Sequence, residues 1–191
     1  DGYQRLIVAT RGGMAICFDE NDARVVGRAA RGVKAITLDE GDEVVGMSIR
    51  REGGLLLTVT ETGYGRLSEL TDYRIQSRGG KGLTNYHTAE YGDVAGIKVV
   101  DPEDDVILIS SEGIIIRMQA CEIRLCRRPS KGVRVMRVEE GDRIVSLARM
   151  PHEEEQPEEE STEEAGESAV PDADEAPAGA PKAEEPSQPE T

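Results

Sequence analysis

The sequence predicts an all-β, propeller-like fold of four-stranded blades that repeat about every fifty residues, followed by a disordered acidic tail. Two observations predict the blades: glycines recur at a fixed step, and short apolar runs recur in phase with them. The step of fifty residues places Gly13, Gly63 and Gly113 in one register. Self-similarity at such a period is typical of repeat architectures, and four strands per unit is typical of a propeller blade. A third observation, the change of composition after Met150, predicts the tail.

A second series of glycines, Gly32, Gly82 and Gly132, keeps the same step. The chain therefore divides into a partial set of blades over residues 1–150 and a tail over 151–191. The blade units cover about 5–54, 55–104 and 105–150. Three blades are too few to close a ring, because propellers typically have about four to eight. The chain opens without a Met, so we expect a fragment of a longer protein with further blades upstream.

Each unit is expected to contain two hairpins. The first unit shows the pattern, with expected strands at residues 6–10, 14–18, 33–38 and 43–49 and a polar connection at 19–31. Runs of this length, rich in Val and Ile and bounded by Gly and Asp, are typical of strands, and the glycines allow tight turns with positive φ. A β-sandwich would explain the strand spacing but not the strict period. WD40 blades are disfavoured because the chain has no Trp.

The charge of the chain is divided unevenly. The net charge is -15, yet residues 151–191 hold fifteen acidic residues and one basic residue, whereas residues 1–150 hold 23 acidic and 22 basic residues. The tail also holds seven of the nine prolines and no aromatic residue, so it cannot bury enough apolar surface to fold. The blade region must fill its core with Val, Ile and Leu, since aromatics make up 3% of the chain. The acidic balance therefore does not exclude a nucleic-acid partner for the blades.

Enzymatic and metal sites find little support in the sequence. Three cysteines form no even disulfide framework, which suits a reducing compartment, and no apolar run is long enough to span a membrane. Cys121 and Cys126 would need two further zinc ligands, and His87 and His152 are the only histidines. Cys17 is expected to be a small buried strand residue. We therefore expect no metal site. We also expect no catalytic residue, because no Ser–His–acid or Cys–His arrangement is apparent.

A basic loop recurs with the same period. Its cations are Arg28 and Arg31, Arg78 and Lys81, and Arg128 and Lys131, with Arg127 added in the third unit. In the middle copy, residues 76–82 read Gln-Ser-Arg-Gly-Gly-Lys-Gly, in which glycine N–H groups and cations suit a phosphate. It is not a nucleotide-binding P-loop, because Gly82 and not Ser or Thr follows Lys81. Equivalent loops of stacked blades lie on one side, so we expect a row of cations.

These motifs resemble those of a known family, the C-terminal domain of the A subunit of bacterial DNA gyrase. The family's signature box is Gln-Arg-Arg-Gly-Gly-Lys-Gly, and residues 76–82 match six of its seven positions, with Ser77 in place of the first Arg. Residues 63–66 and the Glu-Gly-Asp turns at 40–42 and 140–142 are also similar. The resemblance covers residues 3–150, and an acidic tail is common in the family. In the family the box lies early in the domain, whereas here one further repeat follows it.

The resemblance implies a β-pinwheel, a propeller variant whose blades exchange strands and whose basic rim wraps DNA. The implied DNA-binding residues are Arg28, Arg31, Gln76, Arg78, Gly79, Gly80, Lys81, Gly82, Arg127, Arg128 and Lys131. It also implies membership of an ATP-dependent type II topoisomerase that introduces negative supercoils. ATP and Mg²⁺ would then bind outside this fragment, which itself needs no cofactor. The implied partners are double-stranded DNA, together with a second A subunit and gyrase B subunits in a heterotetramer, in the cytoplasm and on the bacterial chromosome.

Two alternatives remain open from the sequence. The corresponding domain of topoisomerase IV has degenerate boxes and fewer blades, so the nearly complete box favours gyrase. In a protein-interaction propeller the basic loops would be solvent-exposed without a binding role, and the acidic tail would bind a basic partner. Retention on a phosphate-bearing resin after removal of the tail would separate DNA binding from that second alternative.

Overall fold

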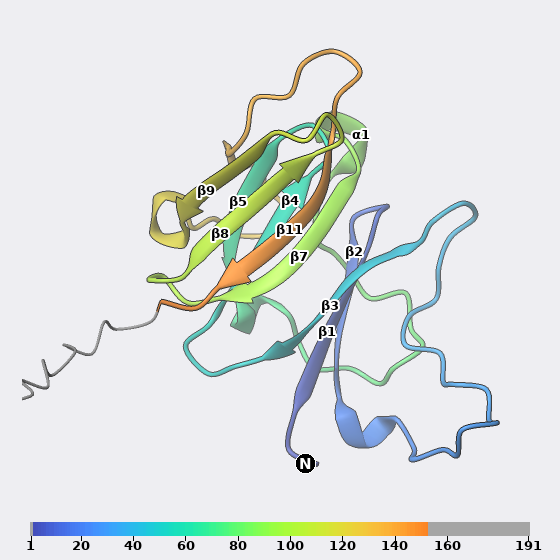
Figure 1. The fold of residues 1–191 in the computed structure, drawn as a ribbon. Coiled ribbons are helices and arrows are strands. Elements are labelled where there is room, and N and C mark those ends of the chain that lie inside the picture. The colour runs from blue at the N-terminus through green and yellow to red at the C-terminus, as the bar shows by residue number, and fades with distance from the viewer. Residues whose placement is uncertain (1, 153–191) are drawn as a thin grey trace, which may run out of the picture. The chain divides into compact units, whose positions relative to one another are not determined.

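The computed structural model describes residues 2–152, which form three antiparallel sheets (Figure 1). The first sheet contains β3 (Val44–Arg50), β1 (Arg5–Thr10), β2 (Met14–Asp19) and β6 (Leu83–Thr84), in that order. The second contains β7 (Val94–Val100), β4 (Leu55–Thr60), β5 (Tyr64–Glu69) and β10 (Val133–Arg134). The third contains β11 (Ile144–Met150), β8 (Asp105–Ser110) and β9 (Ile115–Gln119). The all-β fold class is confirmed.

Helical segments are short. The 3₁₀ turns η1 (Glu20–Asp22), η2 (Leu70–Asp72) and η3 (Ala120–Glu122) follow the second strand of each hairpin, and α1 (Thr88–Tyr91) is a single turn. Across residues 2–152, none of the helices has the length and apolar character that crossing a membrane requires.

The first hairpin of each unit forms as predicted. In the first unit β1 pairs with β2, with Leu6 opposite Phe18 and Ala9 opposite Ala15. Gly13, in the turn between them, has a φ of +84°, a backbone conformation that glycine adopts with little steric cost. The same hairpin recurs as β4–β5 and β8–β9. Apolar runs and tight turns are local properties, which is why sequence reasoning found these strands.

The predicted second hairpin is wrong. Residues 33–38 form no strand, and β3 pairs instead with β1, with Leu6 opposite Ile49. The ladder shifts register between Ala9 and Thr10, and the β4–β7 ladder shifts at the equivalent place, between Val59 and Thr60. The strand after the Glu-Gly-Asp turn therefore closes the inner edge of its own sheet, and the segment before that turn is free to pair elsewhere.

That segment pairs with the preceding blade. In the second unit it forms β6, whose Leu83 lies opposite Ala15 of β2 and whose Thr84 lies opposite Met14. In the third unit it forms β10, which pairs with β5 in the same register, Val133 opposite Gly65. The first and second sheets thus each receive a fourth strand from the unit that follows. This exchange is the β-pinwheel arrangement that the resemblance implied.

The blades pack through their inner strands, β3, β7 and β11, which lie next to one another (Figure 1). Gly46 and Gly96 permit this approach. A Cβ atom at Gly46 would lie 3.1 Å from the side chain of Ile97, and one at Gly96 would overlap Leu147. The same contact therefore repeats one blade further along the chain.

Two main apolar clusters fill the spaces between blades. One joins Ile7 and Cys17 of the first blade to Leu56, Ile97 and other residues of the second. The other joins the second blade to the third and is built largely from Val, Leu and Ile, as the low aromatic content predicted. Cys17 is buried in its strand, again as predicted. Of the predicted acidic tail, residues 153–191 lie outside the described part of the chain.

Candidate nucleic-acid interface

The basic loops of the second and third units run along the outer strand of the preceding blade, on the edge opposite the packed inner strands. The Gln76 N–H donates to the Cys17 carbonyl at 2.9 Å, and Leu83 completes the path beside Ala15. In the next copy the Cys126 N–H donates to the Leu67 carbonyl, also at 2.9 Å. The two loops therefore occupy equivalent places on successive blades and form one continuous rim.

The glycine-rich part of the middle loop is held by its own hydrogen bonds. The Gly79 N–H donates to the Ala35 carbonyl at 2.7 Å, so it is not free for an anion. The Gly80 carbonyl accepts from the Thr37 N–H at 2.8 Å. Gly79 and Gly82 have φ values of +81° and +80°, as tight turns require. The loop is thus a rigid frame. The Gln76 side-chain nitrogen is buried and finds no hydrogen-bond partner among residues 2–152.

Five cations of the predicted site are exposed. They are Arg28, Arg31, Lys81, Arg127 and Lys131. The Lys81 Nζ lies 2.8 Å from Asp39 Oδ1, and both side chains are about two-thirds exposed, at 69% and 66%. The hydrogen bond to Asp39 raises the pKa of Lys81. An exposed pair of this kind contributes at most about 1 kcal/mol, so an incoming phosphate can replace the carboxylate at small cost.

Arg78 and Arg128 behave differently from the exposed cations. Both are half-buried, and each directs its guanidinium group at main-chain carbonyls of the preceding unit. The structure therefore places the predicted cations of the second and third units along successive blades and separates them into exposed and inward-facing members, whereas Arg28 and Arg31 lie in the first-unit loop, which has no preceding blade in this chain.

Aromatic rings surround Lys131. Its Nζ lies 4.3 Å from the centre of the Tyr64 ring and 5.4 Å from that of Tyr91. The Arg134 guanidinium lies 5.1 Å from the centre of the same Tyr64 ring and donates to the Tyr64 hydroxyl at 2.8 Å. Hydrogen bonds from Arg134 and Lys131 lower the pKa of Tyr64. Cation–π contacts at an exposed site contribute about 0.5–1 kcal/mol each, so the rings orient these two cations without neutralising their charge.

A buried arginine, Arg66, lies beneath the rim. Its Nε donates to the Ser130 carbonyl at 3.1 Å and its Nη2 to the Asn85 Oδ1 at 3.0 Å, with a further contact to Ser68. The Tyr73 hydroxyl donates to the same Asn85 oxygen at 2.6 Å. This network ties the strand β5 to the loop that carries Lys131. Sequence reasoning missed it, because Ile16 and Ile116 occupy the equivalent positions and the repeat predicts an apolar residue there.

A further row of cations was also missed. Arg24, Arg74 and Arg124 are spaced by fifty residues, and all three are exposed. Each lies two residues beyond the end of its 3₁₀ turn, η1, η2 or η3. The spacing was visible in the sequence and could have revealed them.

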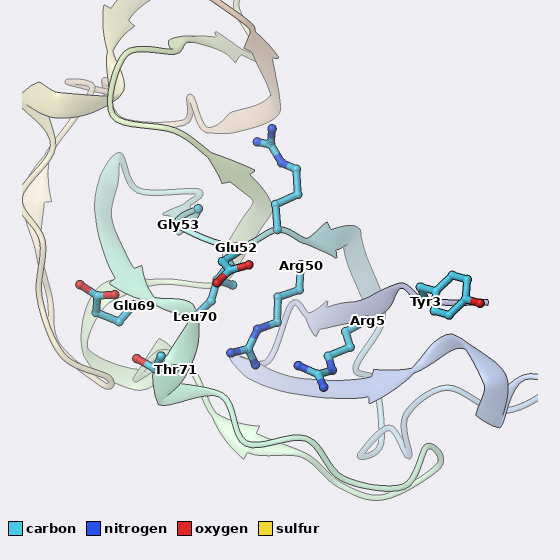
Figure 2. Close-up of a pocket in the computed structure, with 10 residues that line it drawn as sticks. Tyr3, Arg5, Arg50, Glu52, Gly53, Glu69, Leu70 and Thr71 are labelled. Carbon is cyan, nitrogen blue, oxygen red and sulfur yellow. The ribbon is translucent and has the colours of Figure 1, made fainter. Parts of the chain in front are cut away.

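A cleft elsewhere in the described chain shows no comparable row of cations. A cleft between the first and second blades is lined by Arg5, Arg50, Glu52 and Glu69, and Figure 2 shows Arg5 and Arg50 extending from neighbouring strands. Its charges are mixed, and Arg50 donates to the Tyr73 carbonyl at 3.3 Å. Residues 2–152 contain no group of three or more His, Cys, Asp or Glu side chains suited to hold a metal ion.

The tyrosines have structural surroundings. Tyr73 and Tyr86 are each 1% exposed, so neither reaches a ligand at the surface. Burial raises the pKa of Tyr86 to about 12. Tyr64 and Tyr91 are half-buried and Tyr3 is exposed.

Exchange of the fourth strand between repeating four-stranded sheets, with basic loops along the outer edge, defines a β-propeller-like module of the pinwheel type. The chain belongs to the family described as DNA gyrase C-terminal domain, beta-propeller, which matches residues 4–49, 54–101 and 104–149.

Two proteins similar to this chain are A subunits of DNA gyrase. The chain is 38% identical over 147 residues to the gyrase A subunit of Fibrobacter succinogenes, covering 76% of this chain and 16% of that protein. It is 37% identical over 166 residues to the gyrase A subunit of Staphylococcus aureus strain MRSA252, covering 84% of this chain and 19% of that protein. The chain thus spans less than a fifth of the length of these relatives.

Two solved structures share the fold. A DNA gyrase A C-terminal domain superposes with a TM-score of 0.73 at 26% identity, covering 78% of this chain and 51% of the other. The C-terminal domain of a DNA topoisomerase IV gives a TM-score of 0.73 at 28% identity, covering 78% and 47%.

Proposed function

We propose that this chain is the DNA-binding and DNA-wrapping part of a gyrase A subunit, without catalytic residues of its own. The observation that carries the proposal is the placement of the basic loops. They lie along the outer strands of successive blades, and Arg127, Lys81 and Lys131 are exposed there. A duplex that follows this edge would meet a new group of cations at each blade.

Binding would come mainly from neutralisation of phosphates. Such binding is nearly independent of sequence and falls steeply with salt, because each neutralised phosphate releases condensed counterions. Bending about 20–30 base pairs by 40–90° costs on the order of 1–6 kcal/mol, which several phosphate contacts can offset. The proposed contacts are the exposed cations of the predicted set, Arg28, Arg31, Lys81, Arg127 and Lys131. Gln76, Gly79, Gly80 and Gly82 would act by holding the loop in shape.

The holoenzyme supplies the rest of the activity in this proposal. The chain would act within an ATP-dependent type II topoisomerase that introduces negative supercoils, together with a second A subunit and gyrase B subunits. The bond-breaking tyrosine, ATP and Mg²⁺ would lie outside this fragment. The complex would work in the cytoplasm on the bacterial chromosome.

The topoisomerase IV domain is a second candidate, because its structure is as similar as that of the gyrase domain. The six-of-seven match over residues 76–82 supports gyrase. Assay of the holoenzyme on relaxed plasmid with ATP distinguishes the two: gyrase leaves the plasmid negatively supercoiled, and topoisomerase IV does not.

DNA binding itself is tested by titrating the full chain onto two unrelated duplexes of equal length across a range of salt concentrations. We expect similar affinities for both and a strong salt dependence. Changing Lys81 and Lys131 to Ala should weaken binding to both duplexes alike and lower the salt slope by about 1 per residue. Absence of binding at low salt would favour a protein-interaction propeller, and loss confined to one duplex would indicate base readout instead of wrapping.

A further inference from the structure

Arg128 lies in a basic loop, but its guanidinium group donates its hydrogen bonds to other parts of the protein. Its Nε donates to the carbonyl of Asp72 at 3.0 Å and its Nη1 to the carbonyl of Thr84 at 2.7 Å. The guanidinium carbon also lies 5.2 Å from the centre of the Tyr73 ring. All three partners belong to the preceding unit. Arg128 therefore joins its own loop to the loop before it.

Arg78 makes the same two bonds one blade earlier. Its Nε donates to the Asp22 carbonyl at 2.7 Å and its Nη1 to the Lys34 carbonyl at 3.0 Å. The sequence separations are identical in the two copies, 56 residues for the Nε bond and 44 for the Nη1 bond. An arrangement repeated atom for atom is a property of the blade junction and not an accident of one surface side chain.

The acceptors are placed where they fix geometry. Asp22 and Asp72 end the 3₁₀ turns η1 and η2, which follow the outer strands, and Thr84 ends the exchanged strand β6. One planar guanidinium thus connects a turn and an exchanged segment of the preceding unit. A Lys ammonium is a point charge on a flexible stem and does not present this rigid fork of donors.

A second row of arginines, four residues earlier, faces the other way. Arg74 and Arg124 are exposed, and within residues 2–152 their side chains make no hydrogen bond or ion pair. Their main chain is nevertheless fixed: the Arg124 carbonyl accepts from the Leu67 N–H at 3.1 Å, and Ile75, next to Arg74, bridges to Cys17. Each side chain therefore extends outward from an anchored point on the rim, where a phosphate can reach it.

We infer that the two rows divide the work of DNA wrapping: Arg78 and Arg128 are positioning residues that set the path from one rim loop to the next, whereas Arg74 and Arg124 contact phosphates. This inference rests on the proposed DNA function. The inward row determines the curve that the bound duplex follows, and the outward row contributes to affinity through charge.

The test compares Arg124 with Arg128 in the full chain, each changed to Ala and to Lys. Arg124→Ala should lower the salt slope by about 0.9, so that a rise from about 50 to 200 mM salt weakens binding about 3.5-fold less than in the parent. Arg124→Lys should restore the parental slope. Arg128→Ala should leave the slope unchanged but reduce DNA wrapping at saturation, measured as the linking-number change trapped when a nicked plasmid is ligated. Arg128→Lys should not restore it.

Several results would overturn the inference. A loss of slope in Arg128→Ala equal to that in Arg124→Ala would make Arg128 a phosphate contact, as would full restoration of wrapping by Arg128→Lys. An unchanged salt slope in Arg124→Ala would contradict the assignment of the outward row as phosphate contacts. Hydrogen exchange of residues 126–134, measured without DNA, distinguishes failure of the positioning role from failure of the proposed DNA-binding function. Faster exchange in Arg128→Ala than in Arg124→Ala supports the positioning role even if no duplex binds, and equal exchange contradicts it.

Discussion

Gly82 lies directly against the main chain of Ala15, where a Cβ atom on residue 82 would overlap the Ala15 carbonyl oxygen. The contact joins two units of the repeat, since Gly82 precedes the exchanged strand β6 and Ala15 belongs to β2. Gly132 meets the Gly65 carbonyl in the same way one blade later. The recurring glycine is therefore required by strand exchange as well as by its positive φ.

Gly82→Val should destabilise the blade region. The left-handed backbone alone costs roughly 1–3 kcal/mol for a residue with a side chain, and the overlap with Ala15 adds to it. Gly32 holds the same position in the first unit, but no atom lies within 4 Å of a Cβ there and its φ is not positive. Gly32→Val is thus a matched control. Thermal denaturation should show a lower midpoint for Gly82→Val than for Gly32→Val, and equal midpoints would contradict the assigned contact.

Arg66→Ala should cost at least about 2 kcal/mol, because the main-chain carbonyls of Asn85 and Ser130 would lose the donor that Arg66 supplies to them. Among the described residues no carboxylate pairs with Arg66. Its buried positive charge is therefore stabilised by these neutral acceptors and by the Tyr86 ring, whose centre lies 5.3 Å from the guanidinium carbon. Arg74→Ala removes an exposed arginine and should change stability by less than about 0.5 kcal/mol. Urea denaturation measures the stability of both variants, and similar unfolding midpoints would contradict the structural role of Arg66.

Asp142 should make folding depend on pH in acid. Burial alone would raise the pKa of Asp142, but hydrogen bonds from Ser110, Ser111 and the N–H groups of Arg143 and Glu112 outweigh it and lower the pKa from 3.8 to about 2. A carboxylate with a lowered pKa in the folded state stabilises the fold above its unfolded pKa and loses that effect as pH falls. The contribution should therefore be complete above about pH 4 and disappear towards about pH 2.

Asp142→Asn tests this pH dependence. The variant should be less stable than the parent near neutral pH, and the difference should shrink as the pH falls from about 4 to about 2. Glu140→Gln removes a carboxylate from the same turn whose side chain makes no hydrogen bond within the described residues, and it serves as the control. A constant difference between Asp142→Asn and the parent across this range would show that the carboxylate is not the titrating group.

Removal of residues 153–191 should tighten DNA binding at low salt. Residues 153–164 hold eight glutamates and no basic residue. Tethering gives their carboxylates an effective concentration that can reach millimolar near the loop of Arg127 and Lys131, where they compete with phosphates. Charges separated by more than about 8 Å are screened at physiological ionic strength, so the gain should fade as salt rises. Equal binding by the full and shortened chains at low salt would limit the tail to a role in solubility.

Much of the candidate site followed from the repeat. The fifty-residue step predicted which loops carry charge and that equivalent loops share one edge, and the structure places the loops of the second and third units beside the outer strands of the preceding blades. The step could not predict the direction of each side chain. Arg78 and Lys81 are three residues apart in one loop, yet Arg78 turns inward to carbonyls and Lys81 stays exposed. That difference depends on acceptors such as Lys34, 44 residues away, which no local pattern contains.

The sequence by itself determined the period, the first hairpin of each unit, the tight turns and the acidic character of the tail, because alternation, glycine placement and composition act over a few residues. Only the tertiary structure decided where the fourth strand pairs. β6 and β10 are two residues long and have no periodicity of their own, so their pairing depends on the free edges of β2 and β5 in the preceding unit. Tertiary structure likewise decided that Arg66 is buried, since the polar groups of Asn85, Ser130 and Ser68 and the Tyr86 ring, which surround it only in the folded chain, offset the cost of removing its charge from water.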